Sequence, residues 1–154
     1  MTTGKNYAVI GAGNGGKAMA AHLALLGCRI SLYNRTPERI KVILARGGID
    51  LESNGDGPHG FGRLARATDN MEEALNGVDL IHVVVPSSAH ADVAKTMAPH
   101  LRDGQIIVLH PGRTLGAIEF DKVIRANGCT ADVIVSEAET LIYASRSDGP
   151  AQAR

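Results

Sequence analysis

The chain has 154 residues, enough for a single domain with an apolar core of its own. Its 16 basic and 16 acidic residues cancel to a formal net charge of zero, so we expect no nucleic-acid partner and no membrane partner. Only three Tyr and two Phe stand among 18 Gly and many small aliphatic residues, a composition that favours an α/β domain over a β-sandwich.

The N-terminal residues and the cysteines predict a cytoplasmic location. The first residues are polar and lack a signal pattern, and no apolar stretch approaches the length of a membrane span. Cys28 and Cys129 form no CxxC pair, and we expect reduced core residues rather than a disulfide.

Short apolar runs alternate with helical patterns along the chain. The expected strands are residues 7–10, 29–33, 80–85, 105–109 and 132–136. The expected helices are residues 15–26, 37–46, 70–76, 88–97 and 114–127. This alternation predicts a Rossmann-type doubly wound fold, with a mostly parallel sheet in a single domain.

Local signals refine three of these boundaries and one connection. Thr36 is a plausible N-cap for the second helix, Asp69 with Glu72 makes a capping-box pattern for the third, and Ser87 or Ser88 suits the fourth. The stretch from residue 49 to 64 is rich in glycine and predicts a surface hairpin or flap rather than a helix.

A glycine-rich turn follows the first expected strand. Residues 11–16 read Gly-Ala-Gly-Asn-Gly-Gly, which satisfies G-x-G-x-x-G at the start of a helix. Gly11 permits the tight turn, Gly13 lets a pyrophosphate approach the backbone, and Gly16 lets helix and strand pack closely. The alternative is a simple connecting turn, but the context favours a dinucleotide-binding loop. Lys17 either approaches an anionic ligand or is an ordinary solvated lysine.

The end of the second strand indicates which dinucleotide is preferred. An NAD-binding domain would present a carboxylate to the ribose there, whereas this chain has Asn34, Arg35 and Thr36. The Arg35 guanidinium suits a 2′-phosphate, so we expect NADP(H) to be preferred and NAD(H) to remain possible. The alternative for Arg35 is a surface residue at a helix start. Glu38 and Arg39 are assigned no role, since they could form a solvated ion pair.

Ligands of open α/β sheets cross the carboxyl ends of the strands, which adds three segments after later strands. With the glycine loop and residues 34–36, the cofactor-binding candidates are Gly11, Gly13, Asn14, Gly15, Gly16, Asn34, Arg35, Thr36, Val85, Pro86 and Ser87. The substrate-side candidates are His90, Pro111, Gly112, Arg113 and Thr114. His110 and Glu139 are weak catalytic candidates, and Glu137 lies near Glu139.

Each of these segments also has a purely structural interpretation. Ser87, Ser88 and Thr114 are good helix caps, and a Pro-Gly pair is a common turn. His82 lies within an apolar strand and is expected to be a hydrogen-bonded core histidine. We find no cluster of metal ligands and expect no metal.

Five segments together resemble the octopine/nopaline (opine) dehydrogenase family. They are residues 11–16, 33–38, 83–86, 110–114 and 139–146. The first three are shared with glycerol-3-phosphate dehydrogenases and ketopantoate reductases. Pro-Gly-Arg-Thr at 111–114 and Glu-Thr-Leu-Ile-Tyr-Ala-Ser-Arg at 139–146 are the specific ones.

The resemblance implies the reductive condensation of an amino acid with a 2-oxo acid, using hydride from NAD(P)H. In that family a second, helical domain holds the catalytic residues and most of the amino-acid site. We expect residues 1–147 to be the dinucleotide-binding domain and residues 148–154 a tail where the absent helical domain would begin. One alternative is a non-catalytic NADP(H)-binding or redox-sensing module, for which a homodimer is an option. The other is the nucleotide domain of a glycerol-3-phosphate dehydrogenase or ketopantoate reductase relative.

Overall fold

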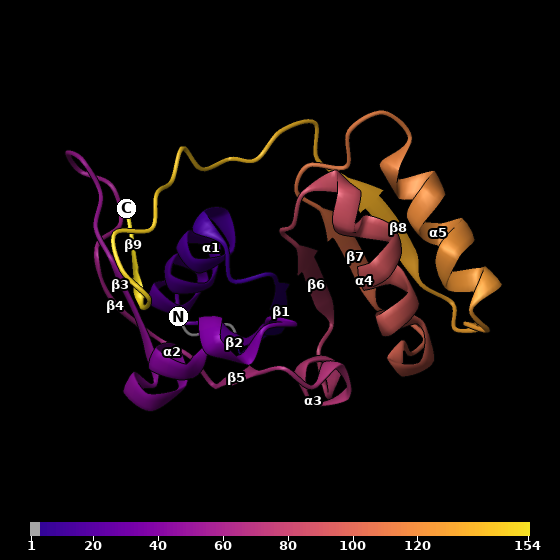
Figure 1. Ribbon diagram of the computed structural model, residues 1–154, viewed down its shortest axis with the longest axis horizontal. Coiled ribbons are helices and arrows are strands. Elements are labelled where there is room, and N and C mark those ends of the chain that lie inside the picture. The colour runs from indigo at the N-terminus through magenta and orange to yellow at the C-terminus, as the bar shows by residue number, and fades with distance from the viewer. Residues whose placement is uncertain (1–3) are drawn as a thin grey trace.

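The computed structural model describes residues 4–154, which form a six-stranded sheet, a three-stranded sheet and flanking helices (Figure 1). Every strand pair of the larger sheet is parallel, and the order β5-β2-β1-β6-β7-β8 is that of a doubly wound Rossmann fold. Its strands are β1 (Asn6–Ile10), β2 (Arg29–Tyr33), β5 (Arg66–Thr68), β6 (Leu80–Val83), β7 (Ile106–Leu109) and β8 (Ile134–Glu137). The expected fold class is confirmed.

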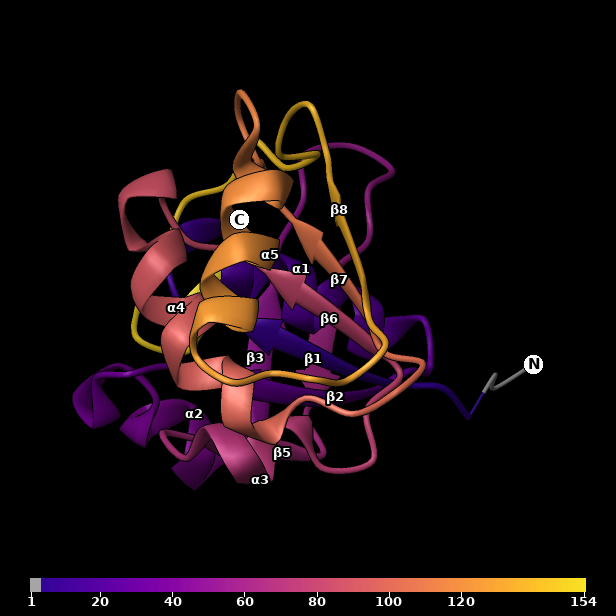
Figure 2. The ribbon, with the colours of Figure 1, turned by 90° about the vertical axis from the view of Figure 1, so that its right-hand side faces the viewer.

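Helices cover both faces of this sheet and enclose two apolar cores. The helices are α1 (Asn14–Leu25), α2 (Lys41–Arg46), α3 (Met71–Leu75), α4 (His90–Met97) and α5 (Gly116–Ala126), with 3₁₀ turns η1 (Pro37–Arg39), η2 (Ser87–Ala89) and η3 (Ala98–His100). One core joins α3, α4 and α5 to the sheet around Met97 and Phe120, and Figure 2 shows α4 and α5 on the same side of β6 to β8. The other core joins α1 and α2 around Met19 and Ile43. Within residues 4–154, no helix has the length and apolar character needed to cross a membrane.

The three-stranded sheet brings distant parts of the chain together. β3 (Gly48–Leu51) and β4 (Gly60–Arg63) form an antiparallel hairpin, which confirms the expected hairpin, and β9 (Gln152–Ala153) pairs in parallel with β3. The hairpin packs closely on α1, because a Cβ added at Gly62 would lie 2.6 Å from the Cα of Ala21. The small sheet therefore forms an outer layer over α1.

A long irregular segment, residues 138–151, links β8 to β9, and we call it the strap. Figure 1 shows it crossing the top of the molecule from β8 to the hairpin. On its way it contacts α1: the Tyr143 hydroxyl lies 2.9 Å from Nδ1 of His22, and Leu141 lies against Gly15, where an added Cβ would come within 2.6 Å of its Cδ2. The strap thus reaches the same helix that the glycine loop begins.

Several local expectations differ from the structure. The sequence patterns missed β5, because this three-residue strand holds a single apolar side chain, Ala67. The helix expected from residue 37 starts as the η1 turn and becomes α-helical only at Lys41. The cap of α3 is Asn70 rather than Asp69, since the Asn70 side chain accepts a hydrogen bond from the amide of Glu73 at 3.1 Å.

Candidate functional site

The glycine loop between β1 and α1 has one position that is open to a ligand. Gly11 has a φ of 113°, and a Cβ there would collide with the backbone of Val84. A Cβ at Gly16 would collide with the carbonyl oxygen of Gly11. At Gly13, in contrast, nothing lies within 4 Å of an added Cβ. The fold itself requires Gly11 and Gly16, whereas the space beside Gly13 remains available for a bound group.

Asn34, directly after β2, holds this loop in place by hydrogen bonds. Its side-chain oxygen accepts a hydrogen bond from the Ala12 amide at 3.0 Å, and its Nδ2 donates to the Thr36 carbonyl at 3.1 Å. Asn34 is one of the expected cofactor-binding residues. In the structure this amide positions the glycine loop, and a contact of Asn34 with a cofactor stays a prediction.

Arg35 and Thr36 follow Asn34 and carry exposed polar groups. The Thr36 hydroxyl makes no capping hydrogen bond, so the expected N-cap does not form and the hydroxyl remains available. Arg35 faces Asp92 of α4 at 3.8 Å, and both side chains are largely exposed, at 79% and 64%. A pair of this kind stabilises little. Sequence reasoning did not single out Asp92, because nothing in the local pattern shows that α4 faces the end of β2.

These segments line one cleft of about 340 Å³ at the carboxyl ends of β1 and β2. The expected cofactor-binding residues that line it are Gly11, Asn34, Arg35, Thr36, Val85 and Pro86. Gly13 and Asn14 line a neighbouring cleft of about the same volume. Ser87 is exposed at the start of η2 and is not part of the lining of either cleft. The η2 turn has no side-chain cap, so neither Ser87 nor Ser88 forms the expected helix cap.

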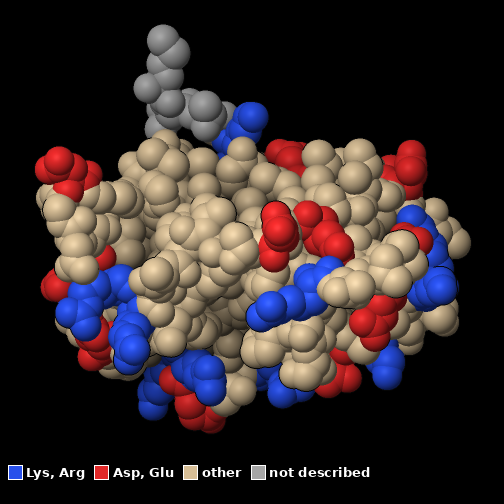
Figure 3. Space-filling view, turned by 90° about the horizontal axis from the view of Figure 1, so that it is seen from above, with Lys and Arg blue, Asp and Glu red and all other residues tan. Residues whose placement is uncertain are grey.

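The face seen from above has no dominant charge of one sign. Figure 3, which looks down on the molecule from above Figure 1, shows acidic and basic side chains interspersed over this face. Attraction of a charged ligand therefore depends on the few charged groups inside the clefts rather than on a broad field.

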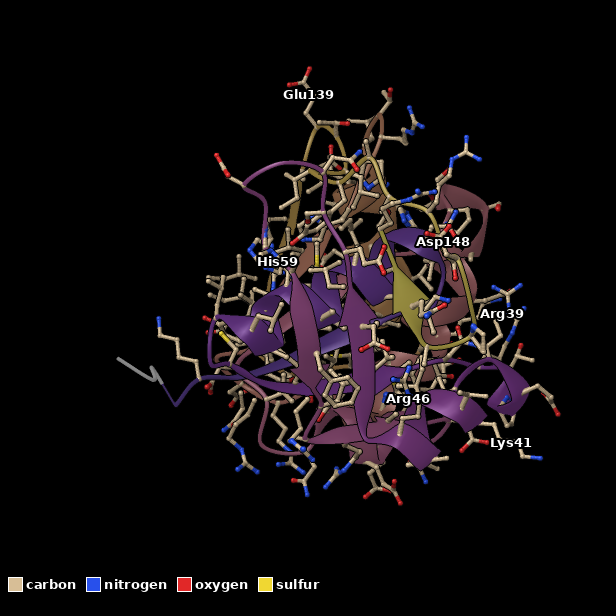
Figure 4. All side chains as sticks on the ribbon, turned by 90° about the vertical axis from the view of Figure 1, so that its left-hand side faces the viewer. Arg39, Lys41, Arg46, His59, Glu139 and Asp148 are labelled. Atoms are coloured by element: carbon tan, nitrogen blue, oxygen red, sulfur yellow. The ribbon has the colours of Figure 1, made fainter. Side chains whose placement is uncertain are left out.

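The loop after β7, which carries the family-specific Pro-Gly-Arg-Thr segment, has an unusual backbone. Arg113 and Leu115 both have a φ of 62°, in the left-handed region that non-glycine residues seldom adopt. Glu137, at the end of β8, caps α5 by accepting a hydrogen bond from the Ala117 amide at 2.6 Å, so Thr114 does not provide the cap. Glu139 is exposed and lies at the top of Figure 4, pointing away from the molecule. Backbone strain of this kind is commonest at functional sites.

Two of the histidines singled out in the sequence, His82 and His110, are half-buried and contact each other. Nδ1 of His82 is 3.0 Å from Nε2 of His110, and the other ring nitrogen of each is buried with no partner among the described residues. Burial and the neighbouring charge of His110 lower the pKa of His82 to about 4, and burial also lowers the pKa of His110. Both imidazoles are therefore neutral at pH 7. We expected both ring nitrogens of His82 to be hydrogen-bonded, but only Nδ1 has a partner among the described residues.

His90 is still more deeply buried. It is 1% exposed at the start of α4 and meets the Phe120 ring edge-on, with 6.4 Å between ring centroids. Burial lowers its pKa, although the carboxylates of Glu119 and Glu137 act in the opposite direction. Among the substrate-side candidates, His90 thus lies in the core, while Arg113 and Thr114 are exposed.

Comparison with known proteins identifies both close sequence relatives and a shared architecture. Residues 6–131 match the family described as the NAD binding domain of 6-phosphogluconate dehydrogenase. The opine dehydrogenase of Arthrobacter sp. (strain 1C) is 40% identical over 152 residues, which are 99% of this chain and 42% of that protein. A glycerol-3-phosphate dehydrogenase of Alcanivorax borkumensis is 34% identical over 104 residues, 67% of this chain and 29% of that protein. The chain thus spans about two fifths of the length of the opine dehydrogenase.

Solved structures share the fold at lower sequence identity. An octopine dehydrogenase with NADH and L-arginine superposes with a TM-score of 0.81 and 20% identity, covering 97% of this chain and 38% of that one. A yersinopine dehydrogenase with NADP⁺ bound superposes with a TM-score of 0.78 and 19% identity, covering 99% of this chain and 38% of that one.

Proposed function

Because the chain belongs to the family of NAD-binding domains represented by that of 6-phosphogluconate dehydrogenase, we propose that it binds NADP(H) as the cofactor domain of an opine dehydrogenase-like oxidoreductase. The observation that carries the proposal is the cleft beside the glycine loop. Arg35 and Thr36 line it directly after β2, where an acidic residue would select NAD(H).

Different residues of the chain would bind different parts of the cofactor. The open space at Gly13 admits the pyrophosphate, next to unpaired amide groups at the start of α1. The guanidinium of Arg35 and the Thr36 hydroxyl face the adenosine ribose and supply donors for its 2′-phosphate. The related solved structures hold NADH in one case and NADP⁺ in the other, so the choice has to come from these side chains.

In the proposed reaction an amino acid and a 2-oxo acid condense to an imine and release water. The nicotinamide supplies a hydride to the imine carbon and a proton reaches the nitrogen, so that NADPH is oxidised as the C=N bond is reduced to CH–NH. The exposed guanidinium of Arg113, in the strained loop after β7, is suited to bind a substrate carboxylate. Each of His82, His90 and His110 has a buried ring nitrogen without a partner among the described residues, so we propose that the proton comes from a residue of another domain.

The opine reaction is favoured over that of glycerol-3-phosphate dehydrogenase by the extent of the similarity. The match to the opine dehydrogenase covers 99% of the chain and so includes the strap with its Glu-Thr-Leu-Ile-Tyr-Ala-Ser-Arg segment. The match to the glycerol-3-phosphate dehydrogenase covers 67%. The strap lies on α1 next to the glycine loop, so its sequence is part of the surroundings of the cofactor cleft.

The cofactor preference is tested by replacing Arg35 with Ala. We expect the unmodified protein to bind NADPH more tightly than NADH, and the variant to lose about 1.5–3 kcal/mol for NADPH with little change for NADH. Isothermal titration calorimetry measures both affinities, and Arg29→Ala, at the opposite end of β2, is the control. Equal affinity of the unmodified protein for NADPH and NADH would contradict the preference.

The catalytic role is tested by joining the chain to the second domain of the Arthrobacter opine dehydrogenase. The chain alone is expected to bind NADPH without oxidising it, because the ligand faces open clefts that do not exclude water. The fusion is expected to oxidise NADPH when an amino acid and pyruvate are both present, followed as loss of absorbance of the reduced cofactor. A folded, cofactor-binding fusion without activity would favour a non-catalytic NADP(H)-binding module.

A further inference from the structure

Lys17 is buried although it lies in the first turn of α1. The sequence left open whether it approaches an anionic ligand or is a solvated lysine, and the structure excludes the second alternative, because the residue is only 5% exposed. Its amine donates hydrogen bonds to the carbonyl oxygen of Gly149, at 2.7 Å, and to the hydroxyl of Ser147. Both acceptors belong to the strap. Lys17 therefore joins the start of α1 to residues that lie 130 and 132 positions later in the chain.

The part of the strap that Lys17 binds is a turn formed by residues 147–150, which we call the strap turn. The carbonyl oxygen of Gly149 accepts hydrogen bonds from the Ser147 hydroxyl, at 2.9 Å, and from the Gln152 amide, at 3.4 Å. Directly after the turn, Ala151 is buried in the core beneath α1, and β9 pairs with β3. The strap turn is therefore held at two places, by β9 and by Lys17.

The strap turn also lines the cleft beside the glycine loop. This cleft of about 340 Å³ is lined by Ala12, Gly13 and Asn14 of the glycine loop, by Lys17 and Arg39, and by Ser147, Gly149 and Pro150 of the strap turn. Gly13 is the position at which the loop leaves open space for a bound group. The space next to Gly13 is therefore bounded in part by residues from a distant segment of the sequence.

The charges around this cleft favour an anionic ligand. No acidic residue is part of the lining, and Asp148, the acidic residue of the strap turn, binds Arg154 at 3.2 Å. Burial, together with the charge of Arg39, lowers the pKa of the Lys17 amine. A phosphate in the cleft would act in the opposite direction and favour the charged amine, which has three donors. An anion beside Gly13 would therefore strengthen the hold of Lys17 on the strap turn.

From these contacts we infer that the strap turn is the outer wall of the pyrophosphate site and that Lys17 is the positioning residue that holds it there. The inference rests on the proposed function and extends it, because it adds residues 147–150 to the cofactor site. Two of the three donors of the Lys17 amine bind the strap turn, so Lys17 acts on the cofactor through that turn. Dinucleotide binding and docking of the strap turn then favour each other by the same free energy.

The test replaces Lys17 with Met, an unbranched residue of similar length without an amine, and measures the affinities for NADPH and NADH by calorimetry. We expect both affinities to fall by a similar factor, on the order of tenfold, because both dinucleotides carry the same pyrophosphate. Arg35→Ala, in contrast, is expected to affect NADPH alone. Lys122→Met, at an exposed position of α5, is the matched control and should leave both affinities unchanged.

Hydrogen exchange of backbone amides reports on the strap turn directly. In the unmodified protein, NADPH is expected to slow the exchange of the Arg146, Gln152 and Arg154 amides, whose hydrogen bonds close the segment around the turn. In Lys17→Met this effect of NADPH should be lost, while the amides of β1 exchange as before. If Lys17 served only the stability of the fold, NADPH would slow the exchange of these amides in the variant as well, and the inference would be wrong.

Ser147→Ala removes the partner of Lys17 from the strap side and leaves α1 unchanged. We expect it to weaken both dinucleotides in the same direction as Lys17→Met. The double variant should lose no more affinity than Lys17→Met alone, because the two residues act through one contact. Additive losses would mean that Lys17 binds the phosphates independently of the strap turn and would overturn its positioning role.

The outcomes separate this inference from the proposed function. If a folded Lys17→Met protein binds both dinucleotides as tightly as the unmodified protein, the inference is wrong while NADP(H) binding stands. A loss confined to NADPH would place Lys17 at the 2′-phosphate and also overturn the inference. If Lys17→Met does not fold, Ser147→Ala decides, and unchanged affinities in that variant contradict the inference. If the unmodified protein binds neither dinucleotide, the inference and the proposed cofactor binding fail together.

Discussion

Replacing Gly13 with Val is expected to abolish the binding of both NADPH and NADH while the protein remains folded. No atom lies within 4 Å of a Cβ at this position and its φ of −77° suits any residue, so the fold can accept the side chain. The isopropyl group would occupy the space through which a pyrophosphate reaches the backbone. We expect a loss of about 3 kcal/mol or more, which is on the order of a hundredfold in affinity.

Calorimetry with each cofactor and circular dichroism measure the two parts of this prediction separately. Gly16→Val provides the contrast, because its side chain would collide with the Gly11 carbonyl and should prevent α1 from packing on β1. A folded Gly13→Val protein that still binds either cofactor would show that the glycine loop only connects strand and helix.

The free energy of unfolding is expected to fall by about 3 kcal/mol, from His82 alone, as the pH decreases from about 6.5 to about 4. The pKa of His82 is about 4 in the folded protein, below the ordinary value of 6.5, because burial and the charge of His110 disfavour its protonated form. In this window the unfolded chain takes up a proton that the folded protein does not, so acid favours unfolding. Below pH 4 both states are protonated and the contribution of His82 ends.

Urea denaturation at a series of pH values measures this effect. His82→Asn should flatten the pH dependence, although the lowered pKa values of His90 and His110 leave some slope in the variant. His59→Asn is the matched control, because His59 is exposed in the β3–β4 loop and its replacement should leave the slope as it is. An identical slope in the His82 variant and the unmodified protein would contradict the assignment.

The features that sequence predicted well are those encoded in adjacent residues. The turn after β1 is predicted by the glycine spacing at 11–16, and the central strands β6 and β7 are predicted to within a few residues by the buried runs at 80–85 and 105–109. The order of the strands follows from the alternation of strands and helices. The positions of Arg35 and Thr36 could be predicted equally well, because in a Rossmann fold the end of β2 lies at a known distance along the chain from the glycine loop.

The features that sequence missed depend on contacts between distant segments. Asp92 contacts Arg35 only because the fold brings α4 next to the residues that follow β2. Glu137 caps α5 from a strand that comes later in the chain, while the residue that looked like the cap, Thr114, makes no such bond. The pairing of His82 with His110 needs β6 and β7 to be neighbours in register. Residue type and spacing alone do not predict these contacts between distant residues.

The strap and β9 also set the order in which the molecule can assemble. The pairing of Asp50 with Gln152 closes a loop of roughly a hundred residues, the kind of long-range contact that forms late because the chain entropy is lost before the contact is gained. During synthesis, the first βαβ unit emerges long before the strap residues that contact Gly15 and Lys17. A nascent chain that has reached β8 has the strands of the larger sheet but leaves one side of α1 uncovered. The surroundings of the glycine loop are therefore completed only after the strap has been synthesised, well over a hundred residues after the loop itself.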